Sequence, residues 1–433
     1  MKKYYIKGNL ILIEKEKDIL IKMRPYSIYA INSYSKKILK ALLKNSNFID
    51  LCNFLGVKNE ISKLNIIQFL EQGIETGILT NNENDKGYLK CKSVTTSPHL
   101  ERVFLEITSA CNLNCKHCYM SSTYKKKLID EIRVNKIKEI INESDIIGVF
   151  RFDLTGGEIF TRTDIYNILA EVRNKFMITN LFTNATLLDE KGIDTIANLG
   201  NIRTIYISLD DYIEEEHDAF RGVEGAFKKT VSNIRELKKR GLHIVANIIV
   251  SRSNIERLKY IIKFCHEELG IDCRTAPILP IGRGKSFTEN DLTLEEIKYA
   301  MSVSLESQCD FVSGLCSENS RIDIIPGCGV GHKMIYIRSN GEICLCPTLS
   351  SRENPLFKLG SIYEDSLLDI WNESKILKEF RESNCEHVNC DHREICRGGC
   401  RSRAYLTSGK MDGRDPILCH YFGIENSDMR REL

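Results

Sequence analysis

The middle of this 433-residue chain is predicted to adopt an α/β fold built from repeated strand and helix units. Between residues 98 and 315, short apolar runs typical of buried strands alternate with longer amphipathic runs typical of helices. Five crossovers of this kind imply parallel strands. Folds of this class place their functional residues at the carboxyl ends of the strands.

The predicted strands of this region are 103–107, 148–154, 177–182, 204–209, 243–250 and 274–279. The predicted helices are 134–143, 163–175, 190–198, 227–240, 255–269 and 294–304. The loop that follows the first strand is therefore expected at the end of the sheet where the chemistry takes place.

The first 95 residues, which we call the head, are predicted to form a separate α+β domain. Its predicted strands are 4–13, 18–23 and 26–31. Its predicted helices are 35–44 with Ser33 as N-cap, 47–55, and 61–75 with Leu64, Ile67, Leu70 and Ile74 on one face. Three strands followed by three helices resemble a winged-helix module.

Composition and charge narrow the function classes. The chain has 61 basic and 59 acidic residues, so no strong electrostatic footprint for nucleic acid or membrane emerges, and we expect neither as a partner. No run approaches 18 consecutive apolar residues, and the first residues lack the pattern of a signal peptide, which predicts a cytoplasmic protein. In that compartment 17 cysteines favour metal or cluster ligation over disulfides.

Three of these cysteines, Cys111, Cys115 and Cys118, share the string CNLNCKHCYM directly after the first predicted strand of the middle region. Three thiolates on one loop can hold three irons of a 4Fe-4S cube and leave the fourth iron open. An open iron can bind a small molecule and take part in its chemistry, whereas a fully ligated cluster only transfers electrons.

Further polar residues follow the next three predicted strands, namely Gly156, Gly157 and Glu158, then Thr183 and Asn184, then Ser208. Together with the Cys-x3-Cys-x2-Cys loop, they resemble the radical S-adenosylmethionine (radical SAM) enzymes. The resemblance implies an oxidoreductase with a partial (β/α)6 TIM-like barrel spanning residues 98–315. It also implies that S-adenosylmethionine binds the open iron through its amino and carboxylate groups, and that cluster reduction releases a 5′-deoxyadenosyl radical.

By the same resemblance, particular residues would contact the cofactor. The residues carried over as cofactor contacts are Gly156, Gly157 and Glu158 for the amino end, Ser208 and Arg221 for the carboxylate and ribose, His117 and Tyr119 for the adenine, and Thr183 and Asn184. His117 departs from the aromatic residue usual before the third cysteine. Each feature has a simpler interpretation: the glycine pair as a tight turn, Ser208 as a strand end, and Arg221 as an ion-pair partner of Asp210, Asp211 or Glu224.

The tail, residues 316–433, carries a second set of cysteines. It resembles the SPASM extension of radical SAM enzymes, which holds two auxiliary 4Fe-4S clusters, and so implies three clusters in all. By resemblance the ligands are Cys385, Cys390, Cys396 and Cys419 for the distal cluster and Cys328, Cys346 and Cys400 for the one nearer the substrate, with Cys316, Cys344 or an open iron completing the latter. Four residues separate Cys385 from Cys390, where the family has two, which puts Cys385 in doubt. Two zinc sites are the alternative.

The function that these parts imply is peptide maturation. The head resembles a PqqD-like RiPP recognition element, in which a leader peptide adds as a strand to a sheet edge. We expect a sactipeptide-type maturase that links a Cys sulfur to a carbon of a ribosomally made precursor, served by an external electron donor of the flavodoxin or ferredoxin type. No catalytic acid or base stands out from the sequence.

Three alternatives to thioether formation follow from the same motifs. The first is carbon-carbon crosslinking, which uses the same oxidative steps, or another modification of a peptide. The second is sulfatase maturation, which is disfavoured because Pro347 follows Cys346 where that family has an Asp. The third is a cluster-bearing regulator that binds DNA through the winged head.

Overall fold

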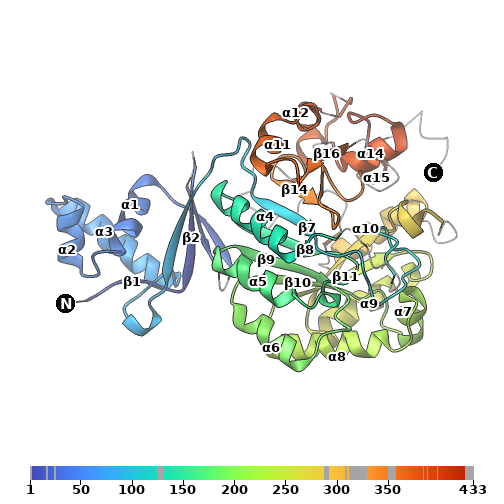
Figure 1. Cartoon of the computed structure of the whole chain (residues 1–433), viewed down its shortest axis with the longest axis horizontal. Helices are drawn as coiled ribbons and strands as arrows, with labels where there is room; N and C mark the ends of the chain where they lie inside the picture. Colours follow the sequence, from blue (N-terminus) through green and yellow to red (C-terminus); the bar gives the residue numbers. More distant parts are fainter. Residues whose placement is uncertain are drawn as a thin grey trace.

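The computed structural model describes residues 2–15, 18–23, 26–123, 131–286, 292–307, 310–311, 329–349, 357–383, 385–387, 389–396 and 398–424. Cys309, Cys316 and Cys328 lie outside these residues. Figure 1 shows the head at one end of the molecule, a barrel in the middle and the tail packed along one side of the barrel.

The head contains more strand than the sequence predicted. Its four-stranded sheet has the order β4-β3-β2-β6, formed by β2 (Asn9–Glu14), β3 (Ile19–Lys22), β4 (Ser27–Ala30) and β6 (Tyr88–Ser93). A separate pair is formed by β1 (Tyr5–Ile6) and β5 (Leu79–Thr80). The predicted run 4–13 is thus two strands, and β6, which runs parallel to β2, was missed.

The three predicted head helices are present as α1 (Ser33–Leu42), α2 (Phe48–Phe54) and α3 (Glu60–Glu75), followed by the short helix η1 (Glu83–Asp85). Two details of the prediction are wrong. The N-cap of α1 is Asn32, whose side chain accepts from the Ser35 amide at 2.8 Å, rather than Ser33. The buried face of α3 contains Ile66 and Leu70, whereas Leu64 is 62% exposed.

The barrel confirms the predicted α/β fold. Its six parallel strands are β7 (Arg102–Glu106), β8 (Arg151–Thr155), β9 (Ile178–Thr183), β10 (Ile202–Ser208), β11 (Ile244–Val250) and β12 (Asp272–Pro277), with β13 (Asp310–Phe311) added beside β12. Each predicted strand overlaps an observed one, because strands buried on both faces read as apolar runs.

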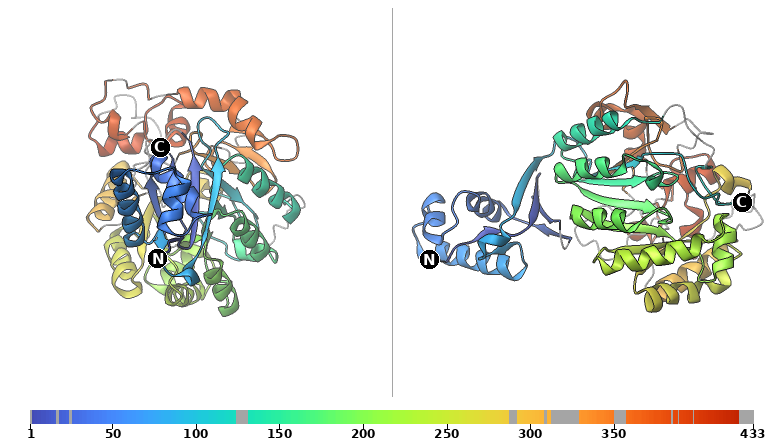
Figure 2. Two further views of the ribbon diagram at one scale, coloured as in Figure 1. Left: turned by 90° about the vertical axis from the view of Figure 1, so that its left-hand side faces the viewer. Right: turned by 60° about the horizontal axis from the view of Figure 1, so that its bottom comes forward.

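Helices cover the outer face of these strands, as Figure 2 shows. They are α4 (Val134–Ile146), α5 (Ile165–Asn174), α6 (Glu190–Leu199), α7 (Glu214–Arg221), α8 (Ala226–Lys239), α9 (Leu258–Lys263) and α10 (Leu294–Glu306). Shorter helical turns are η2 (Ile159–Thr161), η3 (Ile255–Arg257), η4 (Phe264–Leu269) and η5 (Gly282–Ser286). The predicted helix 255–269 is η3, α9 and η4 in succession.

The tail extends the barrel sheet. Its strands β14 (Met334–Ile337), β15 (Glu342–Cys344) and β16 (Lys358–Ser361) follow β7 in the order β7-β14-β15-β16, and β14 runs parallel to β7. Its helices are α11 (Leu367–Glu373), α12 (Lys375–Glu382), α13 (Arg393–Cys396), α14 (Arg401–Ser408) and α15 (Pro416–Tyr421). The first strand of the tail therefore lies directly beside the strand that leads into the three-cysteine loop.

The head sheet packs against the other end of the barrel. One face of the sheet, with Ile11, Ile21 and Met23, forms a buried cluster with Phe150 and Ile178, which lie where β8 and β9 begin. The buried Lys92 of β6 is bonded to Asp145 of α4 at 2.5 Å. The head thus contacts the amino ends of the strands, whereas the cysteine loop follows a carboxyl end. Within the described ranges, no helix has the length and apolarity needed to cross a bilayer.

Candidate active site

The three cysteines of the loop lie together at the carboxyl end of β7. Cys111, Cys115 and Cys118 belong to one small buried cluster with Leu113 and Ala226, and none of them forms a disulfide. Backbone amides point at two of the sulfurs: Leu113 donates to Cys111 Sγ and Ser122 to Cys118 Sγ, both at 3.4 Å. Burial raises the pKa of the Cys111 thiol to about 12, so a thiolate there needs a bound cation or metal to compensate it. The arrangement fits an iron-sulfur cluster.

The glycine pair after β8 is more than a tight turn, because it lies directly on this loop. The Gly157 amide donates to the Thr108 carbonyl at 2.9 Å, and the Glu158 amide donates to the Ala110 carbonyl at 2.8 Å. A Cβ on Gly157 would stand 2.3 Å from the Ala110 oxygen and 2.9 Å from Cys111 Cβ. Only glycine allows this approach.

Glu158 joins the loops after β8 and β9. Its fully buried carboxylate accepts from the Thr183 hydroxyl and the Asn184 amide, both at 2.7 Å. Burial raises the pKa of Glu158, and these hydrogen bonds oppose the increase. Asn184 in turn donates to Asn112 of the cysteine loop at 3.0 Å. The structure brings these predicted residues together, while their contact with a cofactor stays a prediction.

Arg221, at the end of α7, forms the ion pair with Asp210 that was the simpler interpretation of the sequence, and its contact with a cofactor stays a prediction. Its Nε lies 2.5 Å from Asp210 Oδ2, and its Nη1 lies 3.8 Å from Cys115 Sγ. Burial alone would lower the pKa of Arg221, but Asp210 raises it above the ordinary value. The remaining nitrogen, Nη2, is buried and has no hydrogen-bond partner among the described residues. It is thus available to an anionic group beside Cys115.

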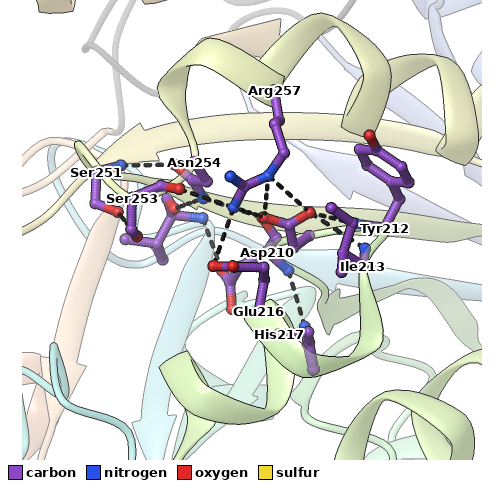
Figure 3. A network of polar contacts seen from close by, with 11 residues as sticks. Asp210, Tyr212, Ile213, Glu216, His217, Ser251, Ser253, Asn254 and Arg257 are labelled. Carbon is purple, nitrogen blue, oxygen red and sulfur yellow. Dashed lines mark hydrogen bonds and ion pairs between the residues drawn. The ribbon is translucent and has the colours of Figure 1, made fainter.

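A network of polar contacts holds Asp210 in place, as Figure 3 shows. Asp210 Oδ1 accepts from the Ile249 amide at 2.9 Å, and its carbonyl accepts from Asn254 at 3.0 Å. The neighbouring Asp211 pairs with Arg257 at 2.6 Å. The two aspartates therefore face different arginines, and only Asp210 reaches the site.

His117 and Tyr119 belong to the cysteine loop, whereas Ser208 lies on β10. His117 stacks on Phe220 with ring centroids 4.3 Å apart, and burial together with the Arg221 charge lowers its pKa to about 3. The Tyr119 hydroxyl bonds to Thr155, and burial raises its pKa. Ser208 ends β10, level with Asn247 of β11. The predicted adenine and ribose contacts of these residues stay predictions.

The tail brings three of the four predicted distal ligands close together. Burial, with Asp415 and Cys385 nearby, raises the pKa of Cys396 to about 11. Burial, with Cys396 and Cys385 nearby, raises the pKa of Cys419 to about 12. Cys390 accepts from the Arg393 amide through its carbonyl, in the turn before α13.

The cysteines predicted nearer the substrate lie on other elements. Cys400 precedes α14, and its amide donates to Asp415 at 2.6 Å. Cys346 Sγ accepts from the Leu349 amide at 3.2 Å, and Cys344 pairs across the sheet with Tyr336. In the part of the chain that the structure describes, no three or more His, Cys, Asp or Glu side chains are arranged to hold a single metal ion.

Two family models match the chain in these regions. Residues 105–265 match the radical SAM superfamily, and residues 328–401 match SPASM, an iron-sulfur cluster-binding domain. The chain carries a radical SAM domain followed by a SPASM domain. These domains imply 4Fe-4S clusters and S-adenosylmethionine as cofactors.

Curated relatives are about a quarter identical to this chain over the aligned residues. An AdoMet-dependent heme synthase of Nitratidesulfovibrio vulgaris is 26% identical over 354 residues, covering 75% of this chain and 93% of the relative. A PqqA peptide cyclase of Granulibacter bethesdensis is 27% identical over 72% of this chain and 85% of its own length. The subtilosin biosynthesis protein AlbA of Bacillus subtilis is 27% identical over 68% of this chain and 66% of its own length.

Solved structures confirm the radical SAM fold. Streptococcus suis SuiB bound to S-adenosylmethionine aligns with a TM-score of 0.66 at 17% identity, over 95% of this chain and 99% of SuiB. Native anSMEcpe with bound AdoMet aligns with a TM-score of 0.58 at 16% identity, over 75% and 95%.

Two groups beside the three-cysteine loop were not found from the sequence. Arg283 of η5 donates to three carbonyls of the cysteine loop, as described below. Glu106, the last residue of β7, accepts from the Tyr336 hydroxyl of β14 and from Ser339 at 2.5 Å. The sequence signal for Arg283 is its place in a Gly-Arg-Gly string after the sixth predicted strand. Glu106 carries no such signal, because its partners lie more than 200 residues away.

Proposed function

We propose that this protein is a radical SAM peptide maturase that forms thioether bonds between Cys sulfurs and carbons of a ribosomally made precursor peptide. The observation that carries the peptide-maturase part of the proposal is that the SuiB fold covers 95% of the chain, whereas the anSMEcpe fold covers 75%. SuiB also has a solved structure bound to its precursor peptide SuiA, which aligns over 97% of this chain. The relatives that include a peptide cyclase and AlbA support the same substrate class.

In this proposal the barrel holds the radical-forming cofactors. Cys111, Cys115 and Cys118 would ligate a 4Fe-4S cluster, and S-adenosylmethionine on its open iron would supply a 5′-deoxyadenosyl radical that removes one hydrogen from the peptide. Arg221 would bind the carboxylate of S-adenosylmethionine through Nη2, since that nitrogen is buried beside Cys115 without a partner among the described residues.

The tail would take up the remaining electron. Closing a carbon-sulfur bond after removal of one hydrogen releases one electron and the thiol proton. Auxiliary clusters on the tail cysteines would accept that electron, and β14 connects the two regions because it pairs directly with β7. We propose two such clusters, ligated by the tail cysteines assigned above.

The head would hold the leader of the precursor. Its sheet ends in β4 on one side and β6 on the other, and a strand at either edge has unpaired backbone groups. An extended peptide that adds to such an edge gains main-chain hydrogen bonds, and neighbouring side chains supply specificity.

The test uses the anaerobically reconstituted full chain with S-adenosylmethionine, dithionite and a Cys-containing peptide encoded beside its gene. We expect 5′-deoxyadenosine, a peptide lighter by two hydrogens per link, and loss of thiol alkylation at the linked cysteines. A carbon-carbon crosslink gives the same mass change but leaves the cysteines alkylatable, so that result would contradict the thioether proposal. If the reconstituted chain forms no 5′-deoxyadenosine, that result would contradict the proposed radical SAM activity.

The curated relatives support a second candidate, AdoMet-dependent heme synthesis, because that match extends over 93% of the relative. Heme synthesis uses no peptide, so this candidate function assigns no role to the head. A heme absorption spectrum that develops on incubation with a porphyrin precursor, in the absence of peptide, would favour it.

A further inference from the structure

Two arginines from distant parts of the chain flank the turn that carries Cys115 and His117. Arg221 approaches from α7, and Arg283 approaches from η5 after the sixth strand of the barrel. Both charges contribute to the low pKa of His117, after the larger effect of its burial. The two arginines nevertheless bind in different ways.

Arg283 binds the backbone of the cysteine loop at three points. Its amide donates to the Cys118 carbonyl at 3.0 Å. Its side chain donates from Nε to the Cys115 carbonyl and from Nη1 to the Ser122 carbonyl, both at 2.8 Å. These contacts span the segment that contains two of the three cysteines, so Arg283 restricts where both sulfurs can lie.

The glycines on either side of Arg283 make this approach possible. A Cβ on Gly282 would stand 2.2 Å from the Tyr119 carbonyl oxygen and 2.7 Å from that of Cys118. A Cβ on Gly284 would stand 2.3 Å from the Leu279 oxygen and 3.4 Å from the His117 oxygen. Gly282 also has φ +59°, which other residues rarely adopt. The Gly-Arg-Gly string therefore lies directly on the cysteine loop.

The charges of the two arginines are balanced differently. Arg221 is paired with the buried carboxylate of Asp210. Arg283 forms no ion pair with any residue that the structure describes, its three bonds go to neutral carbonyls, and its Nη2 is buried without a partner there. Arg283 is half-buried, and an anion beside its unpaired Nη2 would be favourable. Three thiolates around an iron-sulfur core supply one.

We propose that Arg283 is a counter-charge of the radical SAM cluster, held against the backbone of Cys115 and Ser122 so that it favours one-electron reduction. The proposal rests on ligation by Cys111, Cys115 and Cys118. Reduction adds one electron from an external low-potential donor and makes the cluster more negative by one charge. A fixed cation nearby stabilises the reduced state, and net charge is among the factors that set cluster potentials.

The test is a potentiometric titration of the reconstituted full chain, monitored through the EPR signal that S-adenosylmethionine perturbs, which separates this cluster from auxiliary ones. In Arg283→Gln, which loses the charge, we expect the reduction equilibrium constant to fall at least tenfold, or about 59 mV for a one-electron couple. Arg283→Lys keeps the charge but not the three-point contact. We expect its potential close to wild type, with less iron bound per chain.

Lys285→Gln is the matched control, because it removes a charge from an exposed side chain of the same turn. We expect no shift in this variant. Equal potentials in Arg283→Gln and wild type would overturn the proposal, as would equal shifts in Arg283→Gln and Arg283→Lys. Weaker S-adenosylmethionine binding without a change in potential would also overturn it, because Arg283 would then be a cofactor ligand.

The outcome is separable from the peptide proposal. A shifted potential in a protein that leaves every peptide unmodified would support the role of Arg283 and contradict only peptide maturation. A wild-type protein without the S-adenosylmethionine-sensitive signal would overturn the ligation proposal and the role of Arg283 together.

Discussion

The three-cysteine loop and the cysteine-rich tail differ in the charged side chain that acts most strongly on Cys115 and on Cys396, an arginine in the loop and an aspartate in the tail. Arg221 and Arg283 lie beside the loop, and Asp210 compensates only the first of them. In the tail the buried Asp415 raises the pKa of Cys396 and Cys419 in addition to the effect of burial, and Arg401 and Arg414 oppose this increase. Asp415 also caps α15 and pairs with Arg403 at 2.6 Å. If both sets of thiols ligate clusters as proposed, this difference favours reduction at the loop and electron release at the tail.

The largest expected effect comes from removing a loop cysteine. In Cys115→Ala we expect 5′-deoxyadenosine formation to fall more than about 100-fold, beyond the cost of losing a group that only supports a ligand. Chromatographic quantification of 5′-deoxyadenosine and iron analysis measure it. The control is Cys265→Ala, a buried cysteine of the barrel core, which should keep its iron. Equal iron loss in both variants would contradict the assignment.

Removing a tail cysteine should abolish the activity that depends on the tail while preserving the activity of the three-cysteine loop. In Cys419→Ala we expect the iron content to fall and the modification of the peptide to fall to the background level. 5′-Deoxyadenosine formed without peptide should stay within about twofold of wild type, because distant sites act nearly independently. Mass spectrometry of the peptide and product quantification check this. Loss of both activities together would show that the tail cluster is needed for the loop to function.

The two adjacent aspartates of Figure 3 offer a matched pair of variants. In Asp210→Asn we expect S-adenosylmethionine to bind about 10–100-fold more weakly, because Arg221 loses the partner that orients it. Asp211→Asn should leave that Kd unchanged. It should lower the free energy of unfolding by about 1–3 kcal/mol, since Arg257 loses its buried partner. Calorimetric titration and denaturant unfolding distinguish the two.

The smallest expected effect tests the anionic surroundings of the tail. In Asp415→Asn we expect the potential of the tail cluster to rise by up to about 59 mV, a tenfold change in its reduction equilibrium and opposite in sign to that of Arg283→Gln. The control is Asp412→Asn, an exposed aspartate close in sequence. A fall in potential, or an equal rise in both variants, would contradict the comparison of the two regions.

The sequence predicted the barrel well and one of its helices not at all. Strands β7 to β12 were found because apolar runs identify strands buried on both faces. Helix α7 was missed because its sequence, EEEHDAFR, has almost no apolar stripe, although His217, Asp218 and Arg221 are buried. Their burial depends on polar partners such as the Gly225 and Phe227 amides, which both donate to Asp218. Periodicity cannot reveal such bonds.

The candidate site was predicted in part for the same reason. Local strings identified the three cysteines and the glycine pair, because each string has its meaning within a few residues. Arg283 and Glu106 gain their roles only when the barrel brings η5 and β14 beside the first loop, which depends on contacts between residues over 150 positions apart. The prediction of a three-strand head was incomplete because the half-exposed β6 has the mixed sequence YLKCKS, which lacks a clear apolar pattern.

The head touches the barrel where the strands begin, and the three cysteines follow a strand end. If the head binds the leader as proposed, the precursor must extend along the height of the barrel before its target residue reaches the site where the radical forms. The six residues of β9 correspond to roughly 20 Å of that height. The protein would then select its substrates by length. A precursor with too short a spacer between leader and target would bind to the head without being modified.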